Sequence, residues 1–398
     1  TSNVIDQEKM AVILQEVVGK QYDGRYYPNI SGVLRSLNYY PIGDERAEDG
    51  IASLALGLGK YIVDGGQTLR VSPYHPNQIL QTSELDTALR ETQTRFYALD
   101  TRHVGNDFKV DDGFNILNLK VKEAERDNSL NYIASTYDPY DQVIRDGIYD
   151  GGRKVITFAS VLQHGVFPLP QLLQLSMKYG AESMRRPVEI EFACNINQDR
   201  TGALYLLQIR PIVDSKQMLD EDVAAVPDAD CILRSHNSLG HGVTEDVTDI
   251  VYVKTDDRFT ASDNPMIARE IEKINKTYLD NGANYVLVGP GRWGSSDSWL
   301  GIPVKWPHIS AARVIVEVAL KNYRVDPSQG THFFQNLTSF GVGYFTIDEN
   351  RGEGFFCKSE LDAMPSVMET EHVRVVRFAR PLKIMMDGKR QEGAVLRP

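Results

Sequence analysis

The stretch Val188–Pro211 reads V-E-I-E-F-A-C-N-I-N-Q-D-R-T-G-A-L-Y-L-L-Q-I-R-P and has the pattern of a β-hairpin. Its middle supplies the Asn, Asp and Gly residues that favour chain reversal. Side chains on a strand alternate between its two faces, so Glu189 and Glu191 share one face. Gln208 and Arg210 share a face for the same reason. If the strands pair without a bulge about the hairpin centre, Glu191 lies opposite Gln208. Glu189 then lies opposite Arg210.

These four polar side chains allow two interpretations. Oxygen ligands together with one fixed cation are the groups that a magnesium–triphosphate site requires. A half-buried hairpin, however, commonly has one polar face, and Glu opposite Arg is an ordinary cross-strand pair. The spacing alone therefore leaves both a nucleotide site and a structural ion pair open.

Three earlier blocks extend the pattern. They are Met10–Gly19 (M-A-V-I-L-Q-E-V-V-G), Ile30–Pro41 (I-S-G-V-L-R-S-L-N-Y-Y-P) and Gly57–Pro73 (G-L-G-K-Y-I-V-D-G-G-Q-T-L-R-V-S-P). With the hairpin, they resemble in order and approximate spacing the nucleotide-binding (PEP/pyruvate-binding) domain of the phosphoenolpyruvate synthase and pyruvate phosphate dikinase family. The resemblance covers about the first half of the chain and implies an ATP-grasp fold. Lys60 departs from the family pattern, which usually has Glu there, and 35–37 (R-S-L) replaces Phe-Thr-Arg.

The resemblance implies a role for each polar residue. Glu191 and Gln208 would ligate Mg²⁺ that bridges the β- and γ-phosphates of ATP. Glu189 would assist through a metal-bound water or a hydrogen bond. Arg210 would stabilise charge on the transferring phosphoryl group, for which a planar and permanently charged guanidinium is suited. Gln15 would line the nucleotide cleft. We therefore expect an ATP-dependent phosphotransferase that uses ATP and Mg²⁺, with a histidine or a small molecule as the unknown phosphoryl acceptor.

Two other functions stay open. One is a non-catalytic nucleotide-binding or regulatory module, which the departures at Lys60 and Leu37 favour. His308 and His332 come nearest to the family's phosphate-carrying histidine, but their sequence contexts differ from its motif. The other is an assembly domain that docks a partner through Gly289–Trp306, a stretch that holds all three tryptophans. That stretch also follows an expected strand, so its glycines suit either a phosphate-binding loop or a tightly packed structural loop.

The start of the chain bears on the expected partners. In the resembled family, an earlier half of the ATP-grasp domain supplies a lysine and an arginine that hold the phosphates. No such motif precedes Met10, and the first residue is Thr1. We therefore expect a C-terminal half, cut from a longer polypeptide, whose partner is the missing N-terminal half. This chain alone should bind Mg-ATP weakly.

Composition narrows the class of protein. A length of 398 residues favours two domains. The net charge of -11 argues against broad nucleic-acid or anionic-membrane binding, because such partners need a basic face. The three cysteines are widely spaced and form no C-x-x-C pair, which indicates reduced thiols and a cytoplasmic protein. No apolar run is long enough for a membrane span.

The expected fold class is α/β (α+β), with the ATP-grasp half at residues 1–215, a linker at 216–230 and a second α/β domain of unassigned role at 231–398. In the first part we expect a strand over Met10–Val18 and an amphipathic helix over Leu169–Met184. The polar text of Ser83–Asp127 indicates solvated helix or loop. In the second part, strands alternate with a helix over Pro265–Leu279, which is typical of an α/β unit.

Overall fold

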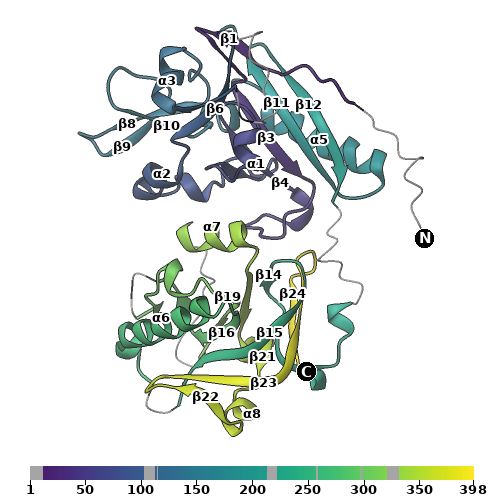
Figure 1. The fold of residues 1–398 in the computed structure, drawn as a ribbon, viewed down its shortest axis with the longest axis vertical. Coiled ribbons are helices and arrows are strands. Elements are labelled where there is room, and N and C mark those ends of the chain that lie inside the picture. Colours follow the sequence, from purple (N-terminus) through teal and green to yellow (C-terminus); the bar gives the residue numbers. More distant parts are fainter. Residues whose placement is uncertain are drawn as a thin grey trace.

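The computed structural model describes residues 12–102, 113, 115–212, 222–256, 259–295, 297, 299–320 and 331–398. Figure 1 shows two lobes, one built from the first half of the chain and one from the second. Both lobes combine sheets with helices, which confirms the expected α/β (α+β) class. Within the described residues, no helix is both long enough and apolar enough to cross a membrane.

The first lobe contains three sheets, with strand orders β12-β11-β3-β4-β5, β1-β2-β6-β7 and β10-β8-β9. Its elements are β1 (Lys20–Tyr22), β2 (Arg25–Tyr27), β3 (Ile30–Arg35), β4 (Ile51–Ala55), α1 (Lys60–Val63), β5 (Leu69–Val71), α2 (Leu85–Glu91), β6 (Arg95–Asp100), β7 (Ile116–Lys120), α3 (Val121–Arg126), β8 (Ala134–Asp138), β9 (Val143–Asp146), β10 (Arg153–Ile156), α4 (Ala159–Leu162), α5 (Leu169–Met184), β11 (Val188–Ile196) and β12 (Gly202–Pro211).

The predicted hairpin forms as β11 and β12, with the expected register. Glu189 pairs with Arg210 and Glu191 pairs with Gln208. A β-bulge follows the second pair, because Phe192 lies opposite Leu206 and Leu207 is the additional residue. The bulge lies on the turn side of both polar pairs and therefore leaves their alignment intact.

One face of the five-stranded sheet forms the core of the first lobe. Ile190 and Phe192 on β11 and Leu34 on β3 are buried in a single apolar cluster with Leu173 of α5. Gly180 lets α5 approach the sheet closely, because a Cβ there would come within 2.9 Å of Ile209 and 3.1 Å of Ile190. The predicted helix therefore covers this apolar face, and the polar residues of the hairpin are left on the other face.

The second lobe is built on one large sheet with the order β14-β20-β19-β16-β15-β23-β24-β13-β21, and β22 pairs with β23. Its elements are β13 (Cys231–Ser235), β14 (Ser238–Leu239), β15 (Gly242–Val253), α6 (Asn264–Asp280), β16 (Tyr285–Pro290), β17 (Arg292–Trp293), β18 (Gly301–Ile302), β19 (Ala312–Val318), α7 (Thr331–Phe340), β20 (Gly343–Ile347), β21 (Gly354–Phe356), α8 (Lys358–Ala363), β22 (Ser366–Glu369), β23 (Val373–Asp387) and β24 (Glu392–Leu396).

Four neighbouring strands of this sheet, β20, β19, β16 and β15, are parallel. Their side chains alternate between two apolar cores. Val251 of β15 packs with Ile271 of α6 in one core, whereas Ile250 packs with Leu361 of α8 in the other. The sheet is therefore covered on both faces, as is usual for parallel strands.

A loop of the first lobe joins the two lobes directly. The loop follows β3, and its Tyr39 ring stacks on His241 with 4.4 Å between the ring centroids. The Tyr40 hydroxyl donates to the carbonyl of Val342 at 3.3 Å. Ile42 is buried in the apolar core of the second lobe. Part of the second-lobe core is thus supplied by the strand–loop segment that also carries Arg35.

Two local expectations are wrong. Residues 10–11 of the expected strand over Met10–Val18 lie outside the described residues, and residues 12–18 form no strand. Val12 and Leu14 are exposed, so the apolar run there has no sheet face to bury. The polar segment Ser83–Asp127 contains the paired strands β6 and β7 in addition to helices. Phe96 and Ala98, two residues apart on β6, are both buried, as on one face of a strand. The charged residues around them obscure this pattern in the sequence.

Gly32 provides a test of the close packing between β3 and β11. It pairs with Phe192, and a Cβ at this position would lie 2.2 Å from the phenyl ring. We expect Gly32→Ala to lower the free energy of unfolding by about 1–3 kcal/mol, because the buried ring has no room to move. Urea denaturation followed by far-UV circular dichroism measures the change.

The matched control is Gly59→Ala. A Cβ there would lie 3.7 Å from Ser31, and the backbone φ of -59° suits any residue. This variant should stay within about 0.5 kcal/mol of the wild type. Equal effects of the two substitutions would contradict the packing argument.

Candidate functional site

The polar face of the five-stranded sheet lines a cavity of about 520 Å³. That volume lies in the usual range for small-molecule sites. Alternation along the strands places every second residue on this face. The lining residues from the strands are Val33 and Arg35 on β3, Ile51 and Ser53 on β4, Arg70 on β5, Glu189 and Glu191 on β11, and Arg210 on β12.

Glu189 is the centre of an ion-paired group in this cavity. Its Oε2 accepts from Arg35 Nε at 2.6 Å, and its Oε1 accepts from Arg210 Nε at 2.8 Å. Its side chain is 9% exposed, whereas both arginine side chains are 56% exposed. One buried carboxylate therefore fixes two guanidinium groups whose outer faces stay open to the cavity.

The titration of this group follows from the same contacts. Burial disfavours the ionised form of Glu189, but the hydrogen bond from Arg210 and the charge of Arg35 outweigh it and hold the pKa of Glu189 below its usual value. The hydrogen bond and charge of Glu189 in turn raise the pKa of Arg210. Glu189 and Arg210 are therefore both charged near neutral pH.

Glu191 and Gln208 lie next to this group, directly opposite one another on β11 and β12. Glu191 lines the cavity, and among the described residues its carboxylate has no hydrogen-bond or ion-pair partner. Gln208 is exposed and is not part of the cavity lining. The pair thus offers carboxylate and amide oxygens at one edge of the cavity, and oxygen is the ligand that Mg²⁺ takes.

Gln15 is placed differently from the other predicted residues. Its Nε2 donates to the carbonyl of Leu207 at 3.0 Å, so it contacts the bulge on the exposed edge strand β12. It is not part of the cavity lining. The structure thus brings Glu189, Glu191 and Arg210 together in one cavity, with Gln208 beside them, and leaves Gln15 outside the group.

Arg70 and Arg35 are cavity residues that sequence reasoning missed. Desolvation lowers the pKa of Arg70 to about 10, and its guanidinium donates to the carbonyl of Tyr40 at 2.9 Å. Asn38 Oδ1 also accepts from Arg70, at 2.5 Å. Asn38 in turn donates to the buried Glu45, whose pKa burial raises. The alternation of side chains along the expected strands indicates which face of a strand each arginine occupies. It does not show that the two arginines reach the same cavity, because that depends on the order of the strands in the sheet.

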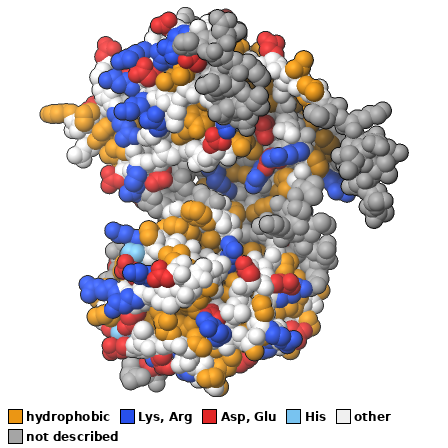
Figure 2. Space-filling model, viewed as in Figure 1, with side chains coloured by type: hydrophobic (Ala, Val, Ile, Leu, Met, Phe, Trp, Pro, Cys, Tyr) orange, Lys and Arg blue, Asp and Glu red, His pale blue; other side chains and the backbone are white. Residues whose placement is uncertain are grey.

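The second lobe completes the cavity. Thr338 of α7 lines it, together with Tyr40 and Ile42 of the loop that enters the second-lobe core. The molecular outline narrows where the lobes meet (Figure 2). A movement of α7 relative to the first lobe would therefore change the shape of the cavity.

The tryptophan-rich stretch Gly289–Trp306 has structural contacts. The Trp293 ring is fully buried, and its Nε1 donates to the carbonyl of Val316 at 3.0 Å. The backbone N–H of Trp293 donates to the buried carboxylate of Glu317 at 2.9 Å, which also accepts from Tyr344 at 2.5 Å. These contacts favour a tightly packed structural loop over a phosphate-binding loop.

Of the two histidines considered as phosphate carriers, His308 is not part of the cavity lining. His308 Nδ1 accepts from the backbone of Lys305 at 3.2 Å, and its Nε2 lies 3.7 Å from Glu272. His332 lies in α7 and not in a strand, and its side chain is outside the described residues. A carrier role for either histidine stays untested.

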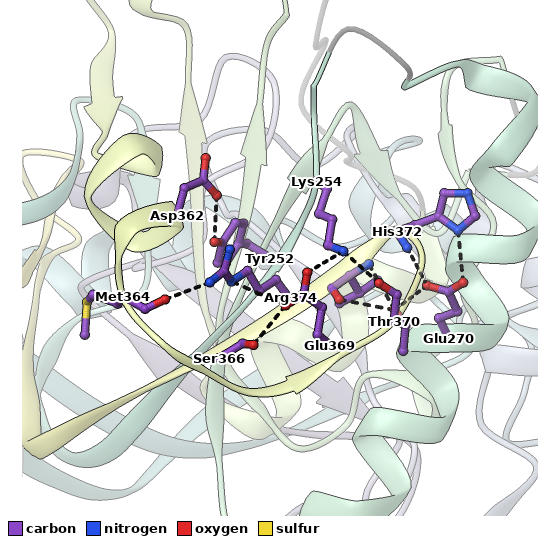
Figure 3. A network of polar contacts seen from close by, with 11 residues as sticks. Tyr252, Lys254, Glu270, Asp362, Met364, Ser366, Glu369, Thr370, His372 and Arg374 are labelled. Atoms are coloured by element: carbon purple, nitrogen blue, oxygen red, sulfur yellow. Dashed lines mark hydrogen bonds and ion pairs between the residues drawn. The ribbon is translucent and has the colours of Figure 1, made fainter.

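A second polar cluster occurs in the second lobe (Figure 3). Figure 3 shows the side chains of Glu270 and His372 pointing toward one another. Together with Glu371 they offer ligand atoms that lie within 4.8 Å of one another, close enough to hold a metal ion. The Glu270 carboxylate, however, accepts from the Thr370 hydroxyl at 2.5 Å, from the His372 backbone at 3.1 Å and from His372 Nδ1 at 2.9 Å. Lys254 Nζ donates to the Thr370 carbonyl at 2.8 Å. The cluster therefore fastens the β22–β23 turn to α6.

Comparison with known proteins identifies the first half of the chain. Residues 2–228 match the family model described as pyruvate phosphate dikinase, AMP/ATP-binding domain. The match covers more than half of the 398 residues, and the chain belongs to this family. No curated protein matches the chain significantly. The resemblance inferred from the hairpin and its neighbouring blocks is confirmed. All the lining residues of the cavity except Thr338 lie within the matched part of the chain.

The buried carboxylate of Glu189 predicts a pH-dependent contribution to stability. At pH 7, Glu189→Gln should lower the free energy of unfolding by about 1–3 kcal/mol, because hydrogen bonds from charged donors are lost. The folded-state pKa of Glu189 lies below its usual 4.5, so this contribution is fully present above that value. It is lost as the pH falls through the folded-state pKa, and the two proteins should then converge.

Urea denaturation at pH 7 and at successively lower pH tests this expectation. Glu182→Gln, an exposed change on α5, serves as the control and should match the wild type throughout. A difference between Glu189→Gln and the wild type that does not change with pH would contradict the ion-pair argument.

Proposed function

We propose, from its membership of the pyruvate phosphate dikinase nucleotide-binding family, that the chain carries the C-terminal half of an ATP-grasp-type site for Mg²⁺-dependent phosphoryl transfer from ATP. The observation that supports this most directly is the polar face of β11 and β12. It directs Glu189, Glu191 and Arg210 into a cavity of about 520 Å³. The acceptor is a histidine or a small molecule.

The charges around the cavity suit a phosphate chain. Three arginines and two glutamates line it, so its lining has one net positive charge although the whole chain carries -11. Arg210 faces the cavity in a fixed orientation because Glu189 holds its Nε. A donor that is held in position before the reaction stabilises developing charge without a reorganisation cost. Arg210 is therefore the group proposed to stabilise the transferring phosphoryl oxygens, with Arg35 beside it.

The oxygen donors fit a magnesium ion. Glu191 and Gln208 would hold it, because they lie opposite one another and the Glu191 carboxylate has no hydrogen-bond or ion-pair partner among the described residues. A bound Mg²⁺ would neutralise charge on the β- and γ-phosphates. Glu189 is committed to Arg35 and Arg210, so its role is to position these two cations. Gln15 would contact nucleotide only if the segment before β1 moved toward the cavity.

The division of the chain follows the same proposal. The nucleotide-binding part lies within residues 1–215, and the linker at 216–230 includes the end of the family match at residue 228. Residues 216–221 of that linker lie outside the described residues. Residues 231–398 form the second α/β lobe, which lacks an assigned role. The phosphate-binding lysine and arginine would come from an N-terminal half of the ATP-grasp domain.

A regulatory nucleotide sensor is the second candidate. The observation that favours it is the position of α7, whose Thr338 lines the cavity and belongs to the other lobe. Nucleotide binding would then change how the lobes pack. Labelling of the native protein with ATP carrying ³²P at the γ- or β-position distinguishes the candidates. Acid-labile histidine label supports the phosphotransferase, whereas binding without label supports the sensor.

Arg210→Ala tests the proposed catalytic residue in the native protein that carries this chain. Phosphoryl transfer should fall by a factor of about 100–1,000, the usual effect of removing one charge-stabilising donor. The measurement is the initial rate of label transfer from ATP at saturating Mg²⁺. Arg186→Ala, an exposed arginine outside the cavity, should keep the wild-type rate. A melting curve of each variant separates loss of activity from loss of fold, and a near-normal rate for a folded Arg210→Ala protein would refute the assignment.

Glu191→Gln tests the metal site independently. Removing one anionic ligand should raise the Mg²⁺ concentration needed for half-maximal activity by about tenfold or more, because carboxylate charge dominates Mg²⁺ binding. The readout is a Mg²⁺ titration of the transfer rate at fixed ATP, with Glu182→Gln as the control. An unchanged midpoint would remove Glu191 from the metal site.

A further inference from the structure

A second cavity of about 360 Å³ lies in the first lobe, away from the five-stranded sheet. It is formed where the β6–β7 sheet meets α3 and the start of β10. It shares no lining residue with the nucleotide cavity. The lining residues are Gln93, Thr94, Lys120, Val121, Lys122, Glu125, Gly152, Arg153 and Lys154.

Positive charge dominates this second cavity. Four cationic side chains and the single carboxylate of Glu125 line it, in a chain whose net charge is -11. Lys120, Lys122 and Arg153 are exposed, and within the described residues none of them has an ion-pair partner. Figure 2 shows Lys and Arg side chains gathered over the part of the first lobe where Figure 1 places α3 and β10. Uncompensated like charges repel one another, so an anion bound among them would be stabilised.

Lys154 is the fixed part of the cavity. Its side chain is only 4% exposed, and its Nζ donates to the carbonyls of Tyr149 and Gly151 at 2.7 Å each. Glu125 Oε1 lies 3.4 Å from the same Nζ. A buried ammonium held by two carbonyls has lost most of its freedom before any ligand arrives. Two of its three N–H donors are taken by these carbonyls and Glu125 lies beside the ammonium, so Lys154 would act on an anion mainly through its fixed positive charge.

The lining also restricts the class of anion. Val121 is the only lining residue with an apolar side chain, and there is no aromatic residue. The lining therefore has no aromatic ring on which a nucleobase could stack. The side-chain amide of Gln93 already donates to the carbonyls of Leu56 and Arg95 and accepts from the backbone N–H of Leu56. The remaining donors are ammonium and guanidinium groups, which bind phosphate and carboxylate oxygens.

We infer that this cavity binds a compact anion with at least two negative charges and no nucleobase, of the inorganic diphosphate class. This site is separate from the proposed nucleotide site and is reached from a different part of the lobe. It adjoins the nucleotide cavity through one residue. Gln67 accepts a hydrogen bond from Thr94 of the second cavity at 3.2 Å, and its chain neighbours Gly66 and Thr68 line the first.

Calorimetric titration of the chain with inorganic diphosphate tests the inference. The titration is done at low ionic strength, where surface charges are least screened, and without divalent cations, so that the metal site recruits no ligand. One equivalent of diphosphate should bind. The double variant Lys122→Glu/Arg153→Glu should weaken binding by at least tenfold. The matched control Lys178→Glu/Arg186→Glu makes the same charge change at exposed positions outside both cavities and should stay within twofold.

A third variant separates this inference from the proposed function. Arg210→Ala alters only the nucleotide cavity and should leave diphosphate binding unchanged. Loss of binding in Arg210→Ala with retention in Lys122→Glu/Arg153→Glu would overturn the inference, as would equal losses in the two charge-reversed doubles or no binding to the wild type. Citrate in place of diphosphate shows whether carboxylates also satisfy the site, and binding of either ion that depends on Lys122 and Arg153 supports it. Circular dichroism confirms that each variant is folded.

Discussion

The buried carboxylate of Glu189 is the constraint on which the first lobe depends. Glu189 lies on β11, the central one of three adjacent strands. Its carboxylate accepts hydrogen bonds from Arg35 on β3 and from Arg210 on β12. Leaving such a carboxylate without partners would cost several kcal/mol, so the register of β3, β11 and β12 is fixed together. A slip of β11 by one residue would move Phe192 to the polar face and Glu189 to the apolar face, away from both arginines. The ion pair is therefore what holds Arg35 and Arg210 in place in the cavity.

This constraint extends into the second lobe. Arg35 ends β3, and the chain then enters the loop whose Tyr39 and Ile42 pack on the other lobe. Arg70 ties the same loop to β5 through Asn38 and the Tyr40 carbonyl. The cavity wall and the interface between the lobes are consequently built from one continuous segment. A ligand that displaces Arg35 or Arg70 would act on the packing of the lobes, because the loop that follows Arg35 contacts both Arg70 and the second lobe.

Local pattern predicted much of the fold. Leu169–Met184 forms the expected helix, and the pairs Glu189–Arg210 and Glu191–Gln208 form as spacing required. The features that were missed depend on contacts distant in sequence. Arg70 reaches the cavity only because β5 lies beside β4, an order that a single sequence does not encode locally. The bulge at Leu207 likewise depends on how the edge strand bends. The alternation of side chains in the sequence does not predict where such a bulge occurs.

Net charge was the least informative property for the site. A value of -11 excludes a broadly basic face, but it says nothing of cavities a few ångströms across. Both cavities of the first lobe have an excess of cations, and a deeply buried charged side chain anchors each of them. Glu189 holds two arginines in the cavity on the five-stranded sheet, and two carbonyls hold Lys154 in the other. At physiological salt, charges more than about 10 Å from a ligand are largely screened. The fixed charges that line each cavity would therefore influence a ligand more than the acidic groups on the rest of the surface. The local arrangement of charge, set by strand register and turn geometry, therefore decides what each cavity binds.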